Sequence, residues 1–172
     1  MNEKIKNLSW LIEFLDIHRD VLVSNSEEGF KARLKLQKAA YLLKRMGVEP
    51  FTKYEYSIYI KGPYSPELAK DYYSELEPAN EVPKIEPEKL EVLWWFVKHD
   101  DRWLEIASSI LHILEDYPGI DKEQLLSTLK MSKPWITLEE FDKVYRELEE
   151  RKLVGNQTVL VSRYGISNQL YT

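Results

Sequence analysis

The residues that could support catalysis or bind a metal are few and scattered. The three histidines, His18, His99 and His112, fall in three separate predicted elements, and neither the His-x-x-x-His nor the Glu-x-x-His pattern of a helical metal site occurs. The chain has no cysteine, which excludes thiol catalysis and Cys-ligated metal. Its six glycines are dispersed and form no phosphate-binding loop. We therefore expect no enzymatic activity, no cofactor and no metal.

Basic residues gather instead on one predicted helix, over residues 30–46. Between residues 31 and 45 there are six lysines and arginines and no acidic residue. Four of them follow helical spacing and predict a stripe on the outer face of the helix, namely Lys31, Lys35, Lys38 and Arg45. Such a stripe is usually a solvated face, but it could also dock an acidic partner or contact nucleic acid.

A tyrosine-rich stretch follows this helix. Residues 54–60 alternate in polarity, with Tyr54, Tyr56, Ile58 and Ile60 on one side and Glu55, Ser57 and Tyr59 on the other. This period of two predicts a half-buried strand. Gly62 and Pro63 then predict a tight turn. Ser65 suits the N-cap of a following helix, and Pro66 suits its first turn.

These two elements together could form one basic, tyrosine-bearing surface. Tyr and Arg are the residue types most enriched at interface hot spots, because each offers contact area and a polar end. The predicted partner-binding residues are Lys35, Lys38, Tyr41, Arg45, Tyr59 and Tyr64. Such a surface suits an acidic protein partner, and it would also suit a nucleic-acid backbone with stacked bases.

The composition is that of a soluble globular protein. The chain has 172 residues, of which 44% are apolar and 31% charged, with a formal net charge of −5. No apolar run approaches the length of roughly 18 residues that a membrane span requires. No signal peptide is recognisable, so we expect a cytoplasmic protein. Abundant Lys and Glu without Cys lean towards a thermophilic source.

The chain is expected to be mainly α, in two parts that pack as one unit. The N-terminal helical part, 1–80, holds helices near 5–22, 30–46 and 66–76 and the strand. A Pro-rich segment then leads to the C-terminal part, 85–172, with helices over 87–98, 101–116, 121–130 and 138–151. Two capping-box sequences start the last two helices, and a small hairpin is predicted over 153–161.

The order of elements after residue 100 is that of a winged helix. Its candidate recognition helix, 138–151, carries six acidic residues and three basic ones. A helix in the major groove is flanked by phosphates and needs basic or neutral neighbours. This helix is therefore not expected to bind DNA, and winged helices also serve as protein-binding modules.

Several short motifs occur in the order seen in known families. They are Lys35-Leu36-Gln37-Lys38, Tyr41-Leu42-Leu43, Gly47, Tyr56 to Tyr59, and Gly62-Pro63-Tyr64-Ser65-Pro66-Glu67-Leu68, and later Lys133-Pro134-Trp135. In this order the chain resembles the YwgA-like and Panacea (SocA-like antitoxin) families. The Panacea form "GPV" is replaced here by "GPY", so the likeness is closer to the YwgA-like branch. The resemblance marks Gln37, Gly62, Pro63, Ser65, Pro66, Lys133, Pro134 and Trp135 as structural motif residues.

The most favoured function is a non-enzymatic protein-interaction module. The resemblance implies an antitoxin-like or adaptor-like protein that binds a partner protein, possibly a toxin. The first alternative is a winged-helix-like transcriptional regulator that contacts DNA through the stripe between Lys31 and Arg45. The second alternative is an uncharacterised enzyme. Trp135, in the turn between two helices, is expected to be mostly buried.

Overall fold

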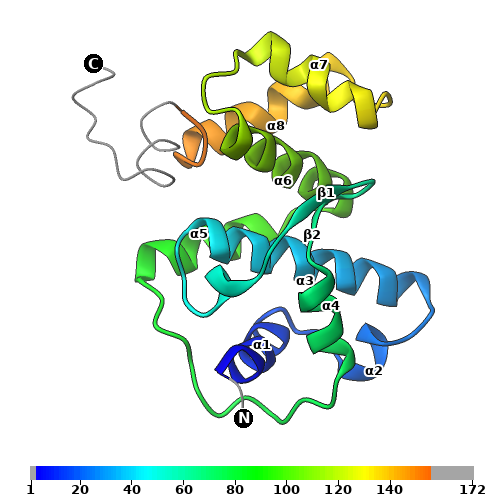
Figure 1. Cartoon of the computed structure of the whole chain (residues 1–172), viewed down its shortest axis with the longest axis vertical. Coiled ribbons are helices and arrows are strands. Elements are labelled where there is room, and N and C mark those ends of the chain that lie inside the picture. Colours follow the sequence, from blue (N-terminus) through cyan, green and yellow to red (C-terminus); the bar gives the residue numbers. More distant parts are fainter. Residues whose placement is uncertain (1–2, 156–172) are drawn as a thin grey trace. The chain divides into compact units, whose positions relative to one another are not determined.

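The computed structural model describes residues 3–155 and is mainly helical, as predicted (Figure 1). Within this range the helices are α1 (Glu3–Phe14), α2 (Arg19–Leu22), α3 (Glu27–Arg45), the 3-10 helix η1 (Phe51–Lys53), α4 (Pro66–Tyr73), α5 (Pro87–Val97), α6 (Asp101–Asp116), α7 (Lys122–Ser132) and α8 (Leu138–Glu150). Two short strands, β1 (Ser57–Tyr59) and β2 (Gly62–Tyr64), form one hairpin.

The chain divides into two compact units. Of the described residues, the first unit comprises 3–57 and 63–104, and the second comprises 58–62 and 105–155. This division differs from the boundary predicted near residues 80–85. The reason is that α5 packs against α3 in the first unit, where its Leu93, Phe96 and Val97 are buried.

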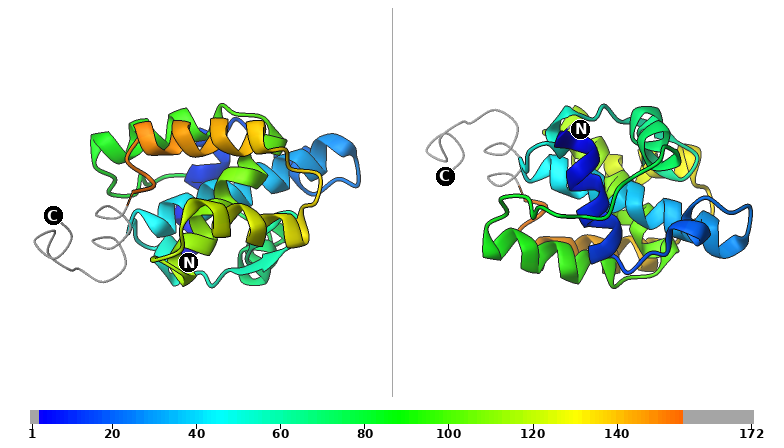
Figure 2. Two further views of the ribbon diagram at one scale, coloured as in Figure 1. Left: turned by 90° about the horizontal axis from the view of Figure 1, so that it is seen from above. Right: turned by 90° about the horizontal axis from the view of Figure 1, so that it is seen from below.

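Helix α3 is the centre of the first unit. It contacts α1, α2, η1 and α5, and α1 crosses it in Figure 2. Ser26 caps its N-terminus by accepting a hydrogen bond from the Gly29 backbone N–H at 3.0 Å. The helix buries an almost continuous run from Leu34 to Leu43, interrupted only at Lys35. A helix covered on several sides has no broad solvent face, which matters for the basic stripe.

The first predicted helix, near residues 5–22, is broken in the structure. It ends at Phe14 and resumes as the short α2 at Arg19. Asp16 lies between them with a φ of +55°, a left-handed conformation that Asp tolerates better than most residues. The turn lets α2 pack on α3, where Gly29 is required because a Cβ would lie 2.6 Å from the Val21 carbonyl oxygen.

The predicted strand over residues 54–60 is in fact one arm of a hairpin. Only Ser57–Tyr59 is strand, and it pairs with Gly62–Tyr64, the residues expected to form a turn. The turn lies at Ile60 and Lys61, neither of which has a positive φ. Gly62 follows with a φ of +94°, as in hairpins whose turn is closed by a glycine. The predicted cap of α4 is confirmed, with Ser65 at the N-cap.

In the second unit, α6, α7 and α8 carry the core. Both predicted capping boxes are present, at Asp121 with Gln124 and at Thr137 with Glu140. The side chains that fill the core from these helices include Ile110, Leu111, Leu125, Leu129, Phe141, Val144 and Leu148. These three helices correspond to those predicted over residues 101–116, 121–130 and 138–151. The predicted hairpin strand Thr158–Val161 lies outside the described residues.

Between residues 3 and 155, none of the helices combines the length and apolar character that crossing a bilayer requires. In the same range there is no group of three or more His, Asp or Glu side chains placed to hold a metal ion.

Candidate interaction surface

The motif residues of the first unit hold the end of the hairpin. The Gln37 side chain donates to the Ser65 carbonyl oxygen at 2.9 Å and accepts from the Ser65 backbone N–H, also at 2.9 Å. Both residues are buried. This pair of bonds does for one residue what a neighbouring strand would do, so it fixes where β2 ends and α4 begins.

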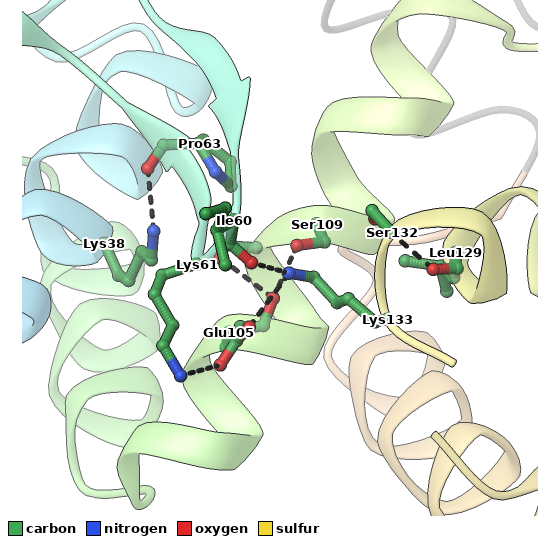
Figure 3. A network of polar contacts seen from close by, with 10 residues as sticks. Lys38, Ile60, Lys61, Pro63, Glu105, Ser109, Leu129, Ser132 and Lys133 are labelled. Carbon is green, nitrogen blue, oxygen red and sulfur yellow. Dashed lines mark hydrogen bonds and ion pairs between the residues drawn. The ribbon is translucent and has the colours of Figure 1, made fainter. Parts of the chain in front are cut away.

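Lys38, the next residue along α3, contacts strand β2. Its Nζ donates to the Pro63 carbonyl oxygen at 2.7 Å, and its side chain is 2% exposed (Figure 3). A lysine is rarely this buried unless its ammonium group is satisfied. Lys38 is therefore a structural residue of the first unit, and it is not part of an outer face.

In the second unit a buried ion pair holds the turn of the hairpin. Lys133, which follows α7, is fully buried, and its Nζ lies 2.9 Å from the Glu105 Oε1 of α6. The same ammonium group donates to the Ile60 carbonyl oxygen. The second Glu105 oxygen, Oε2, lies 3.6 Å from the Lys61 Nζ at the surface. Figure 3 shows Lys61 and Lys133 reaching the two Glu105 carboxylate oxygens, with the Ile60 carbonyl also on the Lys133 Nζ.

This network gives the lysine of the Lys-Pro-Trp motif a structural role. Desolvating two charges is expensive, and their attraction offsets that cost only where geometry and further hydrogen bonds are good. Here the ammonium group has two acceptors and the carboxylate has two cations. Removing one partner would leave a charge buried without compensation. The chain thus holds Ile60 and Lys61 in one place by an arrangement that specifies geometry more than it adds stability.

The end of the hairpin next to this ion pair exposes apolar side chains. Ile58, Tyr59 and Ile60 are 45%, 51% and 81% exposed. We call these three residues the apolar tip. The prediction of a half-buried strand is wrong here, because all three residues of β1 are exposed in the part of the chain that the structure describes. Adjacent exposed apolar side chains on a fixed backbone are typical of an interaction site.

Further exposed apolar residues lie close in sequence to Lys133. Met131 precedes it and Trp135 follows it, and both are exposed. Trp135 is 37% exposed, so it is partly covered but does not lie in the core, and the fully buried residue of the motif is Lys133. Pro134 is exposed as well. Of this segment, it is the Lys133 side chain that reaches the hairpin, through its Nζ on the Ile60 carbonyl oxygen.

The predicted basic, tyrosine-bearing surface does not form as one face. Lys38 and Tyr41 are in the core of the first unit, and the Tyr41 ring meets the Tyr56 ring edge-on at 5.3 Å. Lys35, Arg45 and Tyr64 are half-buried, and Tyr59 alone of the six is well exposed, at the apolar tip. The helical spacing predicts a single apolar face for α3, whereas the helix is covered on several sides by α1, α2, η1 and α5.

Several tyrosines are structural. Tyr54 is buried and donates from its hydroxyl to the Asp71 Oδ2 at 2.6 Å. Burial, together with that carboxylate, raises the pKa of Tyr54 far above its usual value. Burial also raises the pKa of Tyr56 and of Tyr72. The Tyr56 hydroxyl is buried without a hydrogen-bond partner among the described residues.

The sequence reasoning missed Glu105 and Ile60, which make the site. Glu105 is one acid within the apolar run Trp103-Leu104-Glu105-Ile106-Ala107, a position where a carboxylate calls for a buried cation. Ile60 was assigned to the covered side of a strand. Its neighbours Lys61 and Gly62 are the signal for a turn, since a glycine often closes a hairpin.

The geometry of the hairpin can be set beside known proteins. Comparisons with family models, with curated proteins and with solved structures found no match to this chain. The resemblance to the YwgA-like and Panacea families therefore rests on the motif residues alone.

Proposed function

We propose that the protein is a non-enzymatic protein-interaction module, antitoxin-like or adaptor-like, that binds a partner protein through the apolar tip. The single observation that carries the proposal is the exposure of Ile58, Tyr59 and Ile60 at the end of a hairpin whose turn is fastened by the buried Lys133–Glu105 pair. An exposed apolar turn has an unfavourable contact with water that docking would remove.

The contacts that fix the turn in advance support the same proposal. Binding energy is lost when a loop must be ordered on association, so a turn held in advance binds with less entropic cost. The Ile60 carbonyl is held by Lys133, and the carboxylate that holds Lys133 also meets Lys61. Aromatic and aliphatic anchors on such a fixed element are typical of hot spots, and the tip supplies one tyrosine and two isoleucines.

The family resemblance supports the antitoxin-like class. Its motif residues Gln37, Lys38 and Lys133 bond to the backbone of the hairpin or its flank. Motif residues that fix the position of one hairpin fit a family whose function depends on that hairpin or on the side chains it exposes. The partner would then be a protein that accepts an apolar tip, and a toxin is the partner that the resemblance implies.

Site-specific photo-crosslinking tests the proposal. A photoreactive phenylalanine analogue is placed at Ile60, and in a matched variant it is placed at Val82, which is 74% exposed in the segment between α4 and α5. Both positions present an aliphatic side chain to solvent, so nonspecific labelling should be equal. We expect one protein to crosslink from Ile60 and not from Val82, and to compete with unlabelled wild-type protein.

A growth assay tests whether the protein acts as an antitoxin. The product of a neighbouring reading frame is expressed with the wild-type chain, and cell growth is measured. We expect the chain to restore growth and Ile60→Asp to fail while remaining folded. Equal crosslinking from Ile60 and Val82 would contradict the tip as the binding surface. Growth restored equally by Ile60→Asp would contradict its role in neutralisation.

A further inference from the structure

The first unit contains an open pocket that the proposed function does not use. Its volume is about 400 Å³, within the range of small-molecule sites. The apolar part of its lining comes from Leu15, Ile17, Val21 and Ala32. All of these residues belong to the first unit, and the apolar tip belongs to the second.

One wall of the pocket is a face of α3. Glu28, Lys31, Ala32 and Lys35 stand at positions i, i+3, i+4 and i+7, so the helix itself aligns them. The other walls are the α1–α2 connection, with Asp16 and His18, and the start of α6, with Asp101. The conformation of Asp16, with its φ of +55°, makes the chain turn at this wall.

The charged groups around the pocket are not paired with one another. Lys31 is in an ion pair with Glu27, at 3.2 Å. By contrast, the side chains of Asp16, Lys35 and Asp101 have no ion pair or hydrogen bond with any residue between 3 and 155. Along its own helix Lys35 has Lys31 four residues before it and the buried Lys38 three residues after it. Lys35 is also half-buried, so its ammonium group faces less water than a surface lysine does.

We propose that this pocket binds a small zwitterion with an apolar side group, of the amino-acid class. Lys35 would hold the carboxylate by a charge-assisted hydrogen bond. Asp16 and Asp101 would hold the ammonium group, and the apolar lining would cover the side group. A simple organic acid would leave both carboxylates without a cation, and a simple amine would leave Lys35 without an anion, so each should bind less well.

The test uses L-leucine as the probe, titrated into 15N-labelled full-length protein. Isovalerate lacks the ammonium group and isopentylamine lacks the carboxylate, while both keep the branched alkyl group. We expect L-leucine to give saturable amide shifts at Val21 and Ala32. The two half-molecules should bind at least about tenfold more weakly.

Two variants assign the residues, with a matched control. Lys35→Gln removes the cation and Asp101→Asn removes one carboxylate, and each should weaken L-leucine binding at least about tenfold. Lys53→Gln, at an exposed lysine of η1 outside the pocket, should leave it unchanged. Absence of saturable shifts at the pocket, equal binding of either half-molecule, or unchanged binding in both folded variants would overturn the proposal.

Discussion

Replacing Lys133 by methionine tests the account of the hairpin most severely. The substitution keeps an unbranched chain of similar length and removes only the charge and its hydrogen bonds. In the native protein Lys133 is fully buried and its Nζ lies 2.9 Å from the Glu105 Oε1. After the change Glu105 keeps a single cation, the partly exposed Lys61 at 3.6 Å, and the Ile60 carbonyl loses its donor.

The expected cost follows from the burial of the remaining charge. Removing one partner of a buried ion pair destabilises by about 3–5 kcal/mol, which is a large share of the roughly 5–15 kcal/mol that stabilises a typical domain. Lys130→Met is the matched control, because Lys130 is exposed in the last turn of α7, just before Lys133, and its replacement is expected to change stability by less than about 0.5 kcal/mol.

The double variant Lys133→Met/Glu105→Met separates two contributions to this cost: the loss of the ion-pair attraction and the burial of an unpaired Glu105 carboxylate. Replacing both partners by apolar residues is often close to neutral, so the double variant should recover most of the loss. Urea unfolding of the wild type, Lys133→Met, Glu105→Met and the double variant gives the coupling free energy, which we expect to exceed about 3 kcal/mol because each single variant leaves one buried charge unpaired. A Lys133→Met protein no less stable than Lys130→Met, or a double variant worse than both single variants together, would refute the reasoning.

Three further predictions concern the tyrosines and the turn. Gly62→Val should destabilise the protein by more than roughly 1 kcal/mol, because a β-branched residue at a φ of +94° is strained. Gly119→Val is the control and should cost clearly less, since a Cβ there meets no atom within 4 Å and φ is not positive. Equal melting temperatures of the two variants would show that Gly62 is not strained. In urea unfolding, Tyr56→Phe should be neutral or stabilising, because the buried Tyr56 hydroxyl has no partner among the described residues. Tyr54→Phe should lower the free energy of unfolding by about 1.5–3 kcal/mol, because it removes the hydrogen bond to Asp71. A larger loss for Tyr56→Phe than for Tyr54→Phe would contradict these roles. Burial raises the pKa of Tyr54, Tyr56 and Tyr72, so the folded state keeps protons that the unfolded state releases near pH 10. Stability should therefore be full below pH 10 and fall above it by about 1.4 kcal/mol per pH unit for each such tyrosine, and a flat stability profile up to pH 12 would exclude this linkage.

Much of the helical fold could be predicted because its signals are local. Ser65 before Pro66 and the two capping boxes mark where helices begin, and the structure begins α4, α7 and α8 there. The mainly α class follows from the same periodic segments. What local pattern cannot show is how many sides of a helix are covered. That is why Lys38 was placed on an outer face and lies in the core.

The interaction surface depended on contacts between residues far apart in sequence. Lys133 and Glu105 are 28 residues apart, and Lys133 and the Ile60 carbonyl are 73 apart. The sequence marked Lys133 through the Lys-Pro-Trp motif, but the role of the lysine is clear only from its burial. The same contacts leave Ile60 exposed, although alternation alone assigns it to the covered face of a strand.

The most direct test of the central claim is the affinity of the purified partner for two single variants. Ile60→Asp and Val82→Asp place the same charge at two exposed aliphatic positions, 81% and 74% exposed. Because only Ile60 belongs to the apolar tip, we predict that Ile60→Asp raises the Kd at least about tenfold while Val82→Asp leaves it unchanged, both by isothermal titration calorimetry. A folded Ile60→Asp protein that binds with wild-type affinity would contradict the claim that the apolar tip is the docking surface.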